Sequence, residues 1–251
     1  MNDKTLPELM TDGLRRYETR TGHAFGPARA ALFDMDGVLF DSMPSHAKAW
    51  MKMCREAGID AREDEFYLYE GRTGASTINI LFRRNFGREA SEDEIKRLYR
   101  IKTDNFRVMP AVPVMHGATD ALRACREAGI PSLLVTGSGQ YSLMERLDRE
   151  FPGDFPPGRR VTGRDVTHGK PSPEPYILGR TKAGPDIEPW QTVAVDNAPL
   201  GVTSAVASGA FTIGVLTGPM PPGTLLDLGA DIELPSMEDC ACALRLLFRV
   251  K

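Results

Sequence analysis

Two aspartates stand one residue apart at the end of an apolar run, where Ala30–Phe33 is followed by Asp34 and Asp36. Such a run before a turn predicts a buried strand, and ligands of open α/β sheets gather at the carboxyl ends of these strands. Residues two apart in an extended chain point the same way, so both carboxylates can serve one site. Because the two repel each other, they indicate a bound cation or a division into nucleophile and acid. A strand end whose aspartate caps the next helix is the alternative.

Three later segments place further polar groups after apolar runs or in loops. The run Thr192–Val195 ends in an acid and an amide, Asp196 and Asn197, and the run Leu133–Val135 ends in Thr136, Gly137 and Ser138. Lys170 lies just before a helix that Ser172 would cap and Pro173 would begin. An isolated loop lysine is usually solvated, so the order of the segments is more informative than any one of them.

In this order the segments resemble the haloacid dehalogenase (HAD) superfamily of phosphohydrolases, from about Ala30 onward. The resemblance implies that Asp34 attacks phosphorus and forms an aspartyl-phosphate. It makes Asp36 the general acid–base, which protonates the leaving oxygen and then activates water. It makes Lys170 the cation that neutralises charge on the nucleophile and the phosphoryl group.

The resemblance also implies a Mg²⁺ cofactor and a phosphate-binding loop. Thr136 and the amide of Gly137 would hold phosphate oxygens near a helix N-terminus, with Ser138 a helix cap that could also contact phosphate. The second acid usual in the family's last motif is an amide here, which can still bind a metal but brings no charge. The implied metal ligands are Asp34, the main-chain carbonyl of Asp36, Asp196 and Asn197.

The alternation of strands and helices predicts an α/β fold, a Rossmann-like HAD core with a parallel sheet and a small helical cap inserted after the first core strand. Strands are expected at 30–34, 131–136, 192–196, 211–215 and, weakly, 231–234, and helices at 6–20, 45–57, 75–85 and 91–106. The expected division is an N-terminal helical extension (1–29), the core (30–42 and 111–251) and the cap (43–110). Phe40–Ser42 and Met109–Pro110 would be the two hinge strands.

Composition narrows the class of protein. The 251 residues are 41% hydrophobic and 26% charged, with a formal net charge of -3, which gives no support for a nucleic-acid or membrane partner. No membrane-length apolar stretch or secretory signal is evident. The four cysteines lack metal-like spacing and suit reduced thiols. A cytoplasmic monomer is therefore expected, and the resemblance implies a small phosphorylated substrate.

The cap loop bears on the substrate. The chain looks most like the β-phosphoglucomutase-like branch, but mutases carry a lysine before the loop glycine Gly71 and an arginine three residues after it, where this chain has Glu70 and Gly74. Losing two cations argues against binding a second sugar phosphate, although Arg72 could partly substitute. Together with later segments such as Asn197–Val202, the loop resembles the inorganic pyrophosphatases of this branch. Glu70 would then hold Mg²⁺ or bond a protonated phosphate, or merely pair with Arg72.

Two further residues match positions that face the site in the mutase branch. His46 could contact a proton or phosphate, or be a helix-surface histidine at the hinge. Lys102 lies on a charge-rich helix, for which a solvated face is the expectation. The preferred substrate is pyrophosphate or a small phosphate ester; β-phosphoglucomutase, another sugar-phosphate mutase and a sugar phosphatase are the enzymatic alternatives. A module that binds phosphorylated ligands without turnover is the remaining class.

Overall fold

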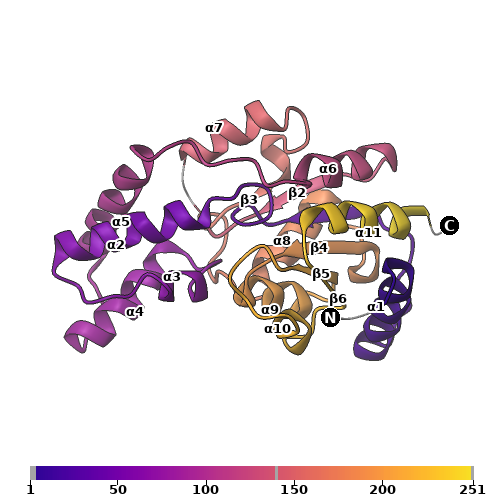
Figure 1. Cartoon of the computed structure of the whole chain (residues 1–251), viewed down its shortest axis with the longest axis horizontal. Coiled ribbons are helices and arrows are strands. Elements are labelled where there is room, and N and C mark those ends of the chain that lie inside the picture. Colours follow the sequence, from indigo (N-terminus) through magenta and orange to yellow (C-terminus); the bar gives the residue numbers. More distant parts are fainter. Residues whose placement is uncertain (1–3, 139–140, 250–251) are drawn as a thin grey trace.

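The computed structural model describes residues 4–138 and 141–249, and its centre is a parallel sheet of six strands in the order β3-β2-β1-β4-β5-β6 (Figure 1). The α/β fold predicted from the sequence is confirmed. Five strands lie within a residue of their predicted bounds, and β3 was missed because two residues carry no periodic pattern. The strands are β1 (Ala30–Phe33), β2 (Ser132–Val135), β3 (Arg160–Val161), β4 (Thr192–Asp196), β5 (Phe211–Val215) and β6 (Ile232–Leu234).

Strand order places β1 at the point where the chain reverses its direction across the sheet. The chain runs outward from β1 through β2 to β3, then returns to put β4 on the other side of β1. Ligands of open α/β sheets bind outside the carboxyl ends of the strands at such a reversal. The residues that follow β1 and β4 are therefore the expected site.

Helices cover both faces of this sheet, so the central strands are buried on both sides and are apolar throughout. Ala31 and Phe33 pack into one apolar cluster with α6 and α11, while Ala30 and Leu32 pack into the other, on the side of α8. The helices of the core are α6 (Ala118–Glu127), α7 (Tyr141–Glu150), α8 (Glu174–Ala183), α9 (Pro199–Ala207), α10 (Thr224–Asp227) and α11 (Met237–Arg249), with 3₁₀ turns at Pro157–Arg159 and Pro189–Gln191.

Four of the five helices between β1 and β2, α2 to α5, form the cap, which stands beside the core in Figure 1. They share an apolar cluster of their own, built around Trp50, Phe66 and Leu98. A capping box formed by Ser91 and Glu94 begins the last of them. The cap helices are α2 (Met43–Ala57), α3 (Glu65–Leu68), α4 (Gly74–Phe86) and α5 (Glu92–Arg107).

The hinge differs from the prediction in its second segment. Phe40 pairs with Val114 in an isolated antiparallel bridge, and the Asp41 amide donates to the Pro113 carbonyl. Met109–Pro110 forms no strand, because the chain leaves α5 through a bend. It pairs with the first hinge segment only from Pro113 onward. The domain boundaries at 42/43 and 110/111 stay predictions.

The N-terminal helix α1 (Leu6–Thr21) matches its prediction and docks on the core through a buried ion pair. Arg20 donates to the Asp231 carboxylate at 2.7 Å and to the carbonyls of Val206 and Ala210 at 3.0 Å. Tyr17 is buried in the same contact and donates to the Gly209 carbonyl at 2.9 Å. The N-terminal extension therefore packs against the core through α1. Its residues 1–3 lie outside the described part of the chain.

All four cysteines are free thiols, as expected, and three of them are buried. Across the described residues no helix is both long and apolar enough to cross a membrane. The monomeric state, the cytoplasmic location and the lack of a nucleic-acid partner stay predictions.

We expect Arg20→Met to destabilise the protein by about 3 kcal/mol, because it keeps the side-chain stem but leaves Asp231 buried without its counter-charge. Urea unfolding measures the loss. Lys4→Met is the control: its pair with Asp12 is solvent-screened, so its removal should change the free energy of unfolding little. Equal losses in the two variants would contradict the role given to the buried pair.

Candidate active site

The carboxyl ends of β1 and β4 bring two predicted acids to one lysine. Lys170 Nζ lies 2.5 Å from Asp34 Oδ1 and 2.7 Å from Asp196 Oδ2, and all three side chains are buried. The Tyr176 hydroxyl, on α8, donates to the same Asp196 oxygen at 2.5 Å. A solvated loop position for Lys170 is therefore ruled out by the structure.

Burial and charge set the protonation of this group. Burial raises the pKa of Asp34 to about 8; Lys170 opposes the rise, and the neighbouring carboxylates of Asp196 and Asp36 add to it. Burial alone would lower the pKa of Lys170, but Asp196 and Asp34 outweigh it and raise that pKa above its usual value. One lysine thus carries the positive charge for several buried acids, and an added cation would stabilise their ionised forms.

A tight turn after Asp36 brings the backbone close to the side-chain amide of Asn197. Gly37 has φ 82°, and a side chain there would overlap with Asn197, so the position requires glycine for both reasons. The Thr217 hydroxyl donates to the Gly37 carbonyl at 2.5 Å and holds the turn. The turn therefore sets the backbone after Asp36 directly against the Asn197 side chain.

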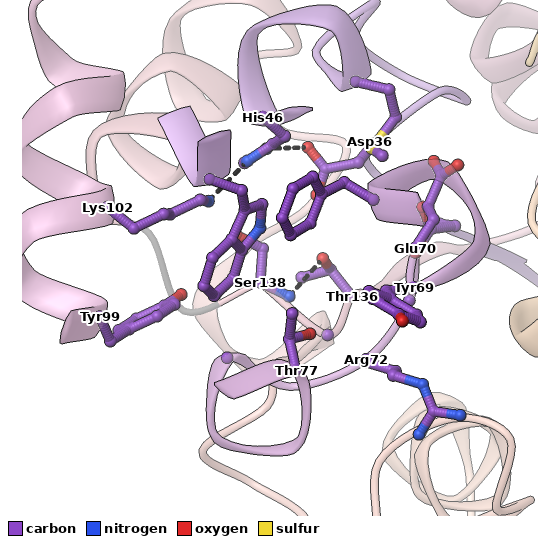
Figure 2. Close-up of a pocket in the computed structure, with 17 residues that line it drawn as sticks. Asp36, His46, Tyr69, Glu70, Arg72, Thr77, Tyr99, Lys102, Thr136 and Ser138 are labelled. Carbon is purple, nitrogen blue, oxygen red and sulfur yellow. Dashed lines mark hydrogen bonds and ion pairs between the residues drawn. The ribbon is translucent and has the colours of Figure 1, made fainter. Parts of the chain in front are cut away.

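A chain of polar contacts links Asp36 to the cap. His46 Nε2 lies 2.9 Å from Asp36 Oδ1, and its Nδ1 lies 2.7 Å from Lys102 Nζ, as the dashed lines of Figure 2 show. The Ser42 hydroxyl donates to the same Asp36 oxygen at 2.5 Å. The expectation of a solvated Lys102 is wrong: its side chain is 3% exposed, because it lies on the one face of α5 that turns inward against aromatic rings.

These contacts shift the pKa values of all three groups. Burial alone would raise the pKa of Asp36, but its contacts with His46 and Ser42 hold that pKa below its usual value. Burial and the nearby Lys102 charge lower the pKa of His46. Burial also lowers the pKa of Lys102 to about 7, against the pull of Asp36. A neutral imidazole that donates through Nε2–H fits these directions.

Glu70 reaches the site from the cap side. Its side chain is 7% exposed, and its Oε1 accepts a hydrogen bond from Asn197 Nδ2 at 3.0 Å. Burial raises its pKa well above the usual value, and the carboxylates of Asp34, Asp36 and Asp196 add to this rise. The alternative of a loop carboxylate paired with Arg72 is not what the structure has.

A cavity of about 60 Å³ lies between the core and the cap, with room for a few water-sized groups. Thr136, Gly137 and Ser138 line its core side, and the Thr136 hydroxyl accepts from the Ser138 amide at 3.0 Å. Arg72 also lines it, but its guanidinium bonds the Ser76 hydroxyl and points away from Asp36 in Figure 2. Asp34, Asp36, His46 and Glu70 line the same cavity. Lys170, Asp196 and Asn197 do not line it but join it through their contacts with Asp34 and Glu70.

Sequence reasoning missed the cavity wall that Tyr99 forms. Tyr99 lies on α5, and a side chain at Gly74 would overlap with its ring. The mutase arginine position is thus filled by a tyrosine that is distant in sequence. Trp50, which packs in the apolar cluster of the cap, also lines the cavity, and Thr77 is a further lining residue. No local pattern marks Tyr99, because its partner is a glycine on another helix.

The residues present fit a magnesium ion by their oxygen chemistry. Asn197 Oδ1 is buried without a hydrogen-bond partner, while its Nδ2 is bonded to Glu70. An orphaned buried acceptor beside acids of raised pKa is what a hard cation would satisfy. Among the described residues no three side chains of the His, Cys, Asp or Glu types form a ready metal cluster, so the set relies on amide and carbonyl oxygens as well.

The fold and site together define a class: a Rossmann-like α/β protein with an aspartate at the switch point of its parallel sheet and a helical cap over it. The chain belongs to the haloacid dehalogenase-like hydrolases, which match residues 28–209. Within this family it is an enzyme of the phosphatase type, related to β-phosphoglucomutase.

Three known proteins are similar to this chain in sequence or in structure. Hexitol phosphatase A of Escherichia coli is 34% identical, over 73% of this chain and 81% of its own length. The 2-deoxyglucose-6-phosphate phosphatase 1 of Saccharomyces cerevisiae is 28% identical, over 81% and 86%. The structure of a proposed β-phosphoglucomutase from Bacteroides vulgatus superposes with a TM-score of 0.90 at 42% identity, over 96% of this chain and 99% of that one. None of these three relatives is named as a pyrophosphatase, so the resemblance to that branch is not shown.

We expect the stability difference between Lys102→Met and the wild type to depend on pH. In the unfolded chain the pKa of Lys102 returns to 10.5 from about 7 in the folded protein. Between these values the unfolded wild type binds more protons, so wild-type stability rises with pH by up to about 1.4 kcal/mol per unit, a rise that the variant lacks.

Urea unfolding in the presence of a metal chelator, at pH values of about 7 and 9, measures the free energy of unfolding of both proteins. The value for the variant minus the value for the wild type should be smaller at pH 9 than at pH 7. Lys96→Met, on the exposed side of α5, is the matched control and should show the same difference at both. A Lys102→Met difference that is constant with pH would contradict the lowered pKa.

Proposed function

We propose that the protein hydrolyses small phosphate compounds through a covalent intermediate on Asp34, and that inorganic pyrophosphate is its preferred substrate. The observation that carries the choice of substrate is the buried Glu70 carboxylate, which lines the same small cavity as Asp34 and Asp36. A second phosphoryl group on a sugar would meet this anion where mutases offer cations. Pyrophosphate with its bound cation needs no sugar pocket and supplies the missing positive charge.

In this proposal the reaction has two displacements at phosphorus. A carboxylate oxygen of Asp34 attacks, the Asp34 O–P bond forms, and the P–O bond to the leaving phosphate breaks. The leaving oxygen takes a proton from Asp36. Water then loses a proton to Asp36 and attacks phosphorus, which releases the second phosphate and restores the Asp34 carboxylate. Lys170 holds Asp34 in position and balances the charge that spreads over the phosphoryl oxygens.

Mg²⁺ would be held by Asp34, the main-chain carbonyl of Asp36, Asp196 and Asn197, with Glu70 close to the same region through its bond to Asn197. When bound, it neutralises phosphate charge and orients the group for in-line displacement. The polar chain from Lys102 through His46 orients the Asp36 carboxyl for proton transfer at the leaving oxygen. Thr136 and the Gly137 amide bind the transferring phosphoryl oxygens.

Hydrolysis of a sugar phosphate is the second candidate function, and the names of the relatives favour it. Hexitol phosphatase A and 2-deoxyglucose-6-phosphate phosphatase 1 are 34% and 28% identical to this chain. Against a large sugar stand the ring of Tyr99 over Gly74 and the carboxylate of Glu70, which narrow the cavity from the cap side. Mutase activity is the third candidate, supported by the similar structure from Bacteroides vulgatus.

We expect pyrophosphate to lead other substrates by about two orders of magnitude in kcat/KM with Mg²⁺ present. Phosphate release is compared for pyrophosphate, hexitol phosphates, 2-deoxyglucose 6-phosphate and β-glucose 1-phosphate. Asp34→Asn is the blank and should abolish turnover of every substrate, because the amide cannot form the phosphoryl ester. A hexitol phosphate that leads instead would overturn the pyrophosphate assignment and establish the second candidate. Isomerisation of β-glucose 1-phosphate with a bisphosphate activator would establish the mutase.

We expect Glu70→Gln to raise the Mg²⁺ concentration for half-maximal pyrophosphatase activity by about 10–100-fold, since it removes a charge beside the metal ligands. The substitution keeps the size of the side chain and an oxygen that can accept from Asn197. Glu92→Gln, exposed at the start of α5, should leave the magnesium dependence unchanged. An unaltered magnesium dependence in Glu70→Gln would mean that Glu70 acts only by excluding larger substrates.

A further inference from the structure

Three core glycines lie where the cap loop Glu70–Thr73 reaches the core, and none of them needs glycine for its backbone conformation. Gly137, Gly163 and Gly169 are absent from the glycines with left-handed φ. Other L-residues could therefore adopt these backbone angles without strain. What a side chain would change at these positions is the space between the core and the cap.

The contact at Gly137 is the tightest. A Cβ atom there would overlap with the carbonyl oxygen of Gly71 and lie 3.1 Å from that of Arg72. Both obstacles are main-chain atoms of the cap loop, so they can yield only if the loop itself moves. Gly163 packs closely against Gly137, since a Cβ at Gly163 would lie 2.6 Å from the Gly137 carbonyl oxygen.

Gly169 makes the same kind of contact with the end of the loop. A Cβ at this position would lie 2.9 Å from the Thr73 methyl group, Cγ2. That methyl cannot rotate away freely, because the Thr73 hydroxyl caps α4 by accepting from the Ser76 amide at 3.2 Å. Gly71 of the loop in turn lies over the Lys170 side chain, where its own Cβ would be 3.2 Å from Cδ.

We infer that Gly137, Gly163 and Gly169 form a seat without side chains that sets how deeply the cap loop docks, and that this depth limits the size of the substrate. The same loop carries Glu70 at its start, so its depth fixes the distance between Glu70 and the acids of the core. A Cβ in the seat would lift the loop, enlarge the cavity and withdraw Glu70. The consequence for substrate size rests on the proposed function; the docking itself does not.

The test compares alanine variants of graded expected effect. Gly137→Ala should lower kcat/KM for pyrophosphate by about 10²-fold, since a displacement of about 1 Å at a site has effects of this size. The same variant should lower kcat/KM for hexitol phosphates by a smaller factor. The ratio of kcat/KM for hexitol phosphates to that for pyrophosphate should therefore rise. Gly158→Ala is the matched control: a Cβ there meets nothing within 4 Å, and neither constant should change.

Hydrogen exchange without substrate measures the docking directly. Gly137→Ala should speed amide exchange over residues 70–77, and Gly158→Ala should not. If pyrophosphate proves to be no substrate of the wild type, the proposed function fails, while exchange and the size preference among the esters it does hydrolyse still test the seat. Unchanged exchange together with an unchanged size preference in Gly137→Ala would overturn the inference.

A double variant guards against a general loss of folding. Gly169→Ala should give an intermediate effect, and Thr73→Ser added to it should restore both exchange and activity, since serine keeps the helix cap but lacks the methyl. Thr73→Ser alone should stay close to the wild type. Failure of the double variant to recover, with Gly169→Ala folded by circular dichroism, would mean that the contact with Thr73 does not govern docking.

Discussion

Two buried carboxylates, Asp34 and Asp196, share one lysine at the carboxyl edge of the sheet, and the rest of the site depends on balancing their charge. Burial of an unpaired ion is costly, so Lys170 must stay where it touches both. Tyr176 and the Ala198 amide also donate to Asp196 and leave one lone pair of its Oδ1 open to a cation. With Asp36 and Glu70 nearby, this lysine leaves a negative excess, which is the condition under which a hard cation binds.

The substitution of an amide for the family's second acid changes where that negative charge comes from. Asn197 contributes no charge, yet its Nδ2 bonds the carboxylate of Glu70, which belongs to the cap. A charge that the core would otherwise carry is thus supplied by the cap loop. Charge balance at the core and docking of the cap are thereby linked, because withdrawing the loop would remove an acid from the site.

The cap is joined to the catalytic end of β1 by a second connection through side chains. His46 of α2 and Lys102 of α5 lie in line with Asp36, and the aromatic rings around Lys102 exclude water from them. Such a buried polar chain is strong where all its members are paired and costly where one is missing. In this structure the chain is paired at each link and ends on the Asp36 carboxyl, which it holds in place.

The sequence by itself determined the α/β class, the five predicted strands to within a residue at each end, and the residues of the core motifs, because apolar runs ending in polar groups are local signals. It did not reveal β3, whose two residues have no period, or the shift of the hinge to Val114. Only the tertiary structure decided the fate of the cap residues. Lys102 was expected in solvent because its helix is rich in charge, and Tyr99 gave no signal because it acts through Gly74. Both roles arise from packing between elements far apart in the chain, where neighbours in space cannot be read from neighbours in sequence.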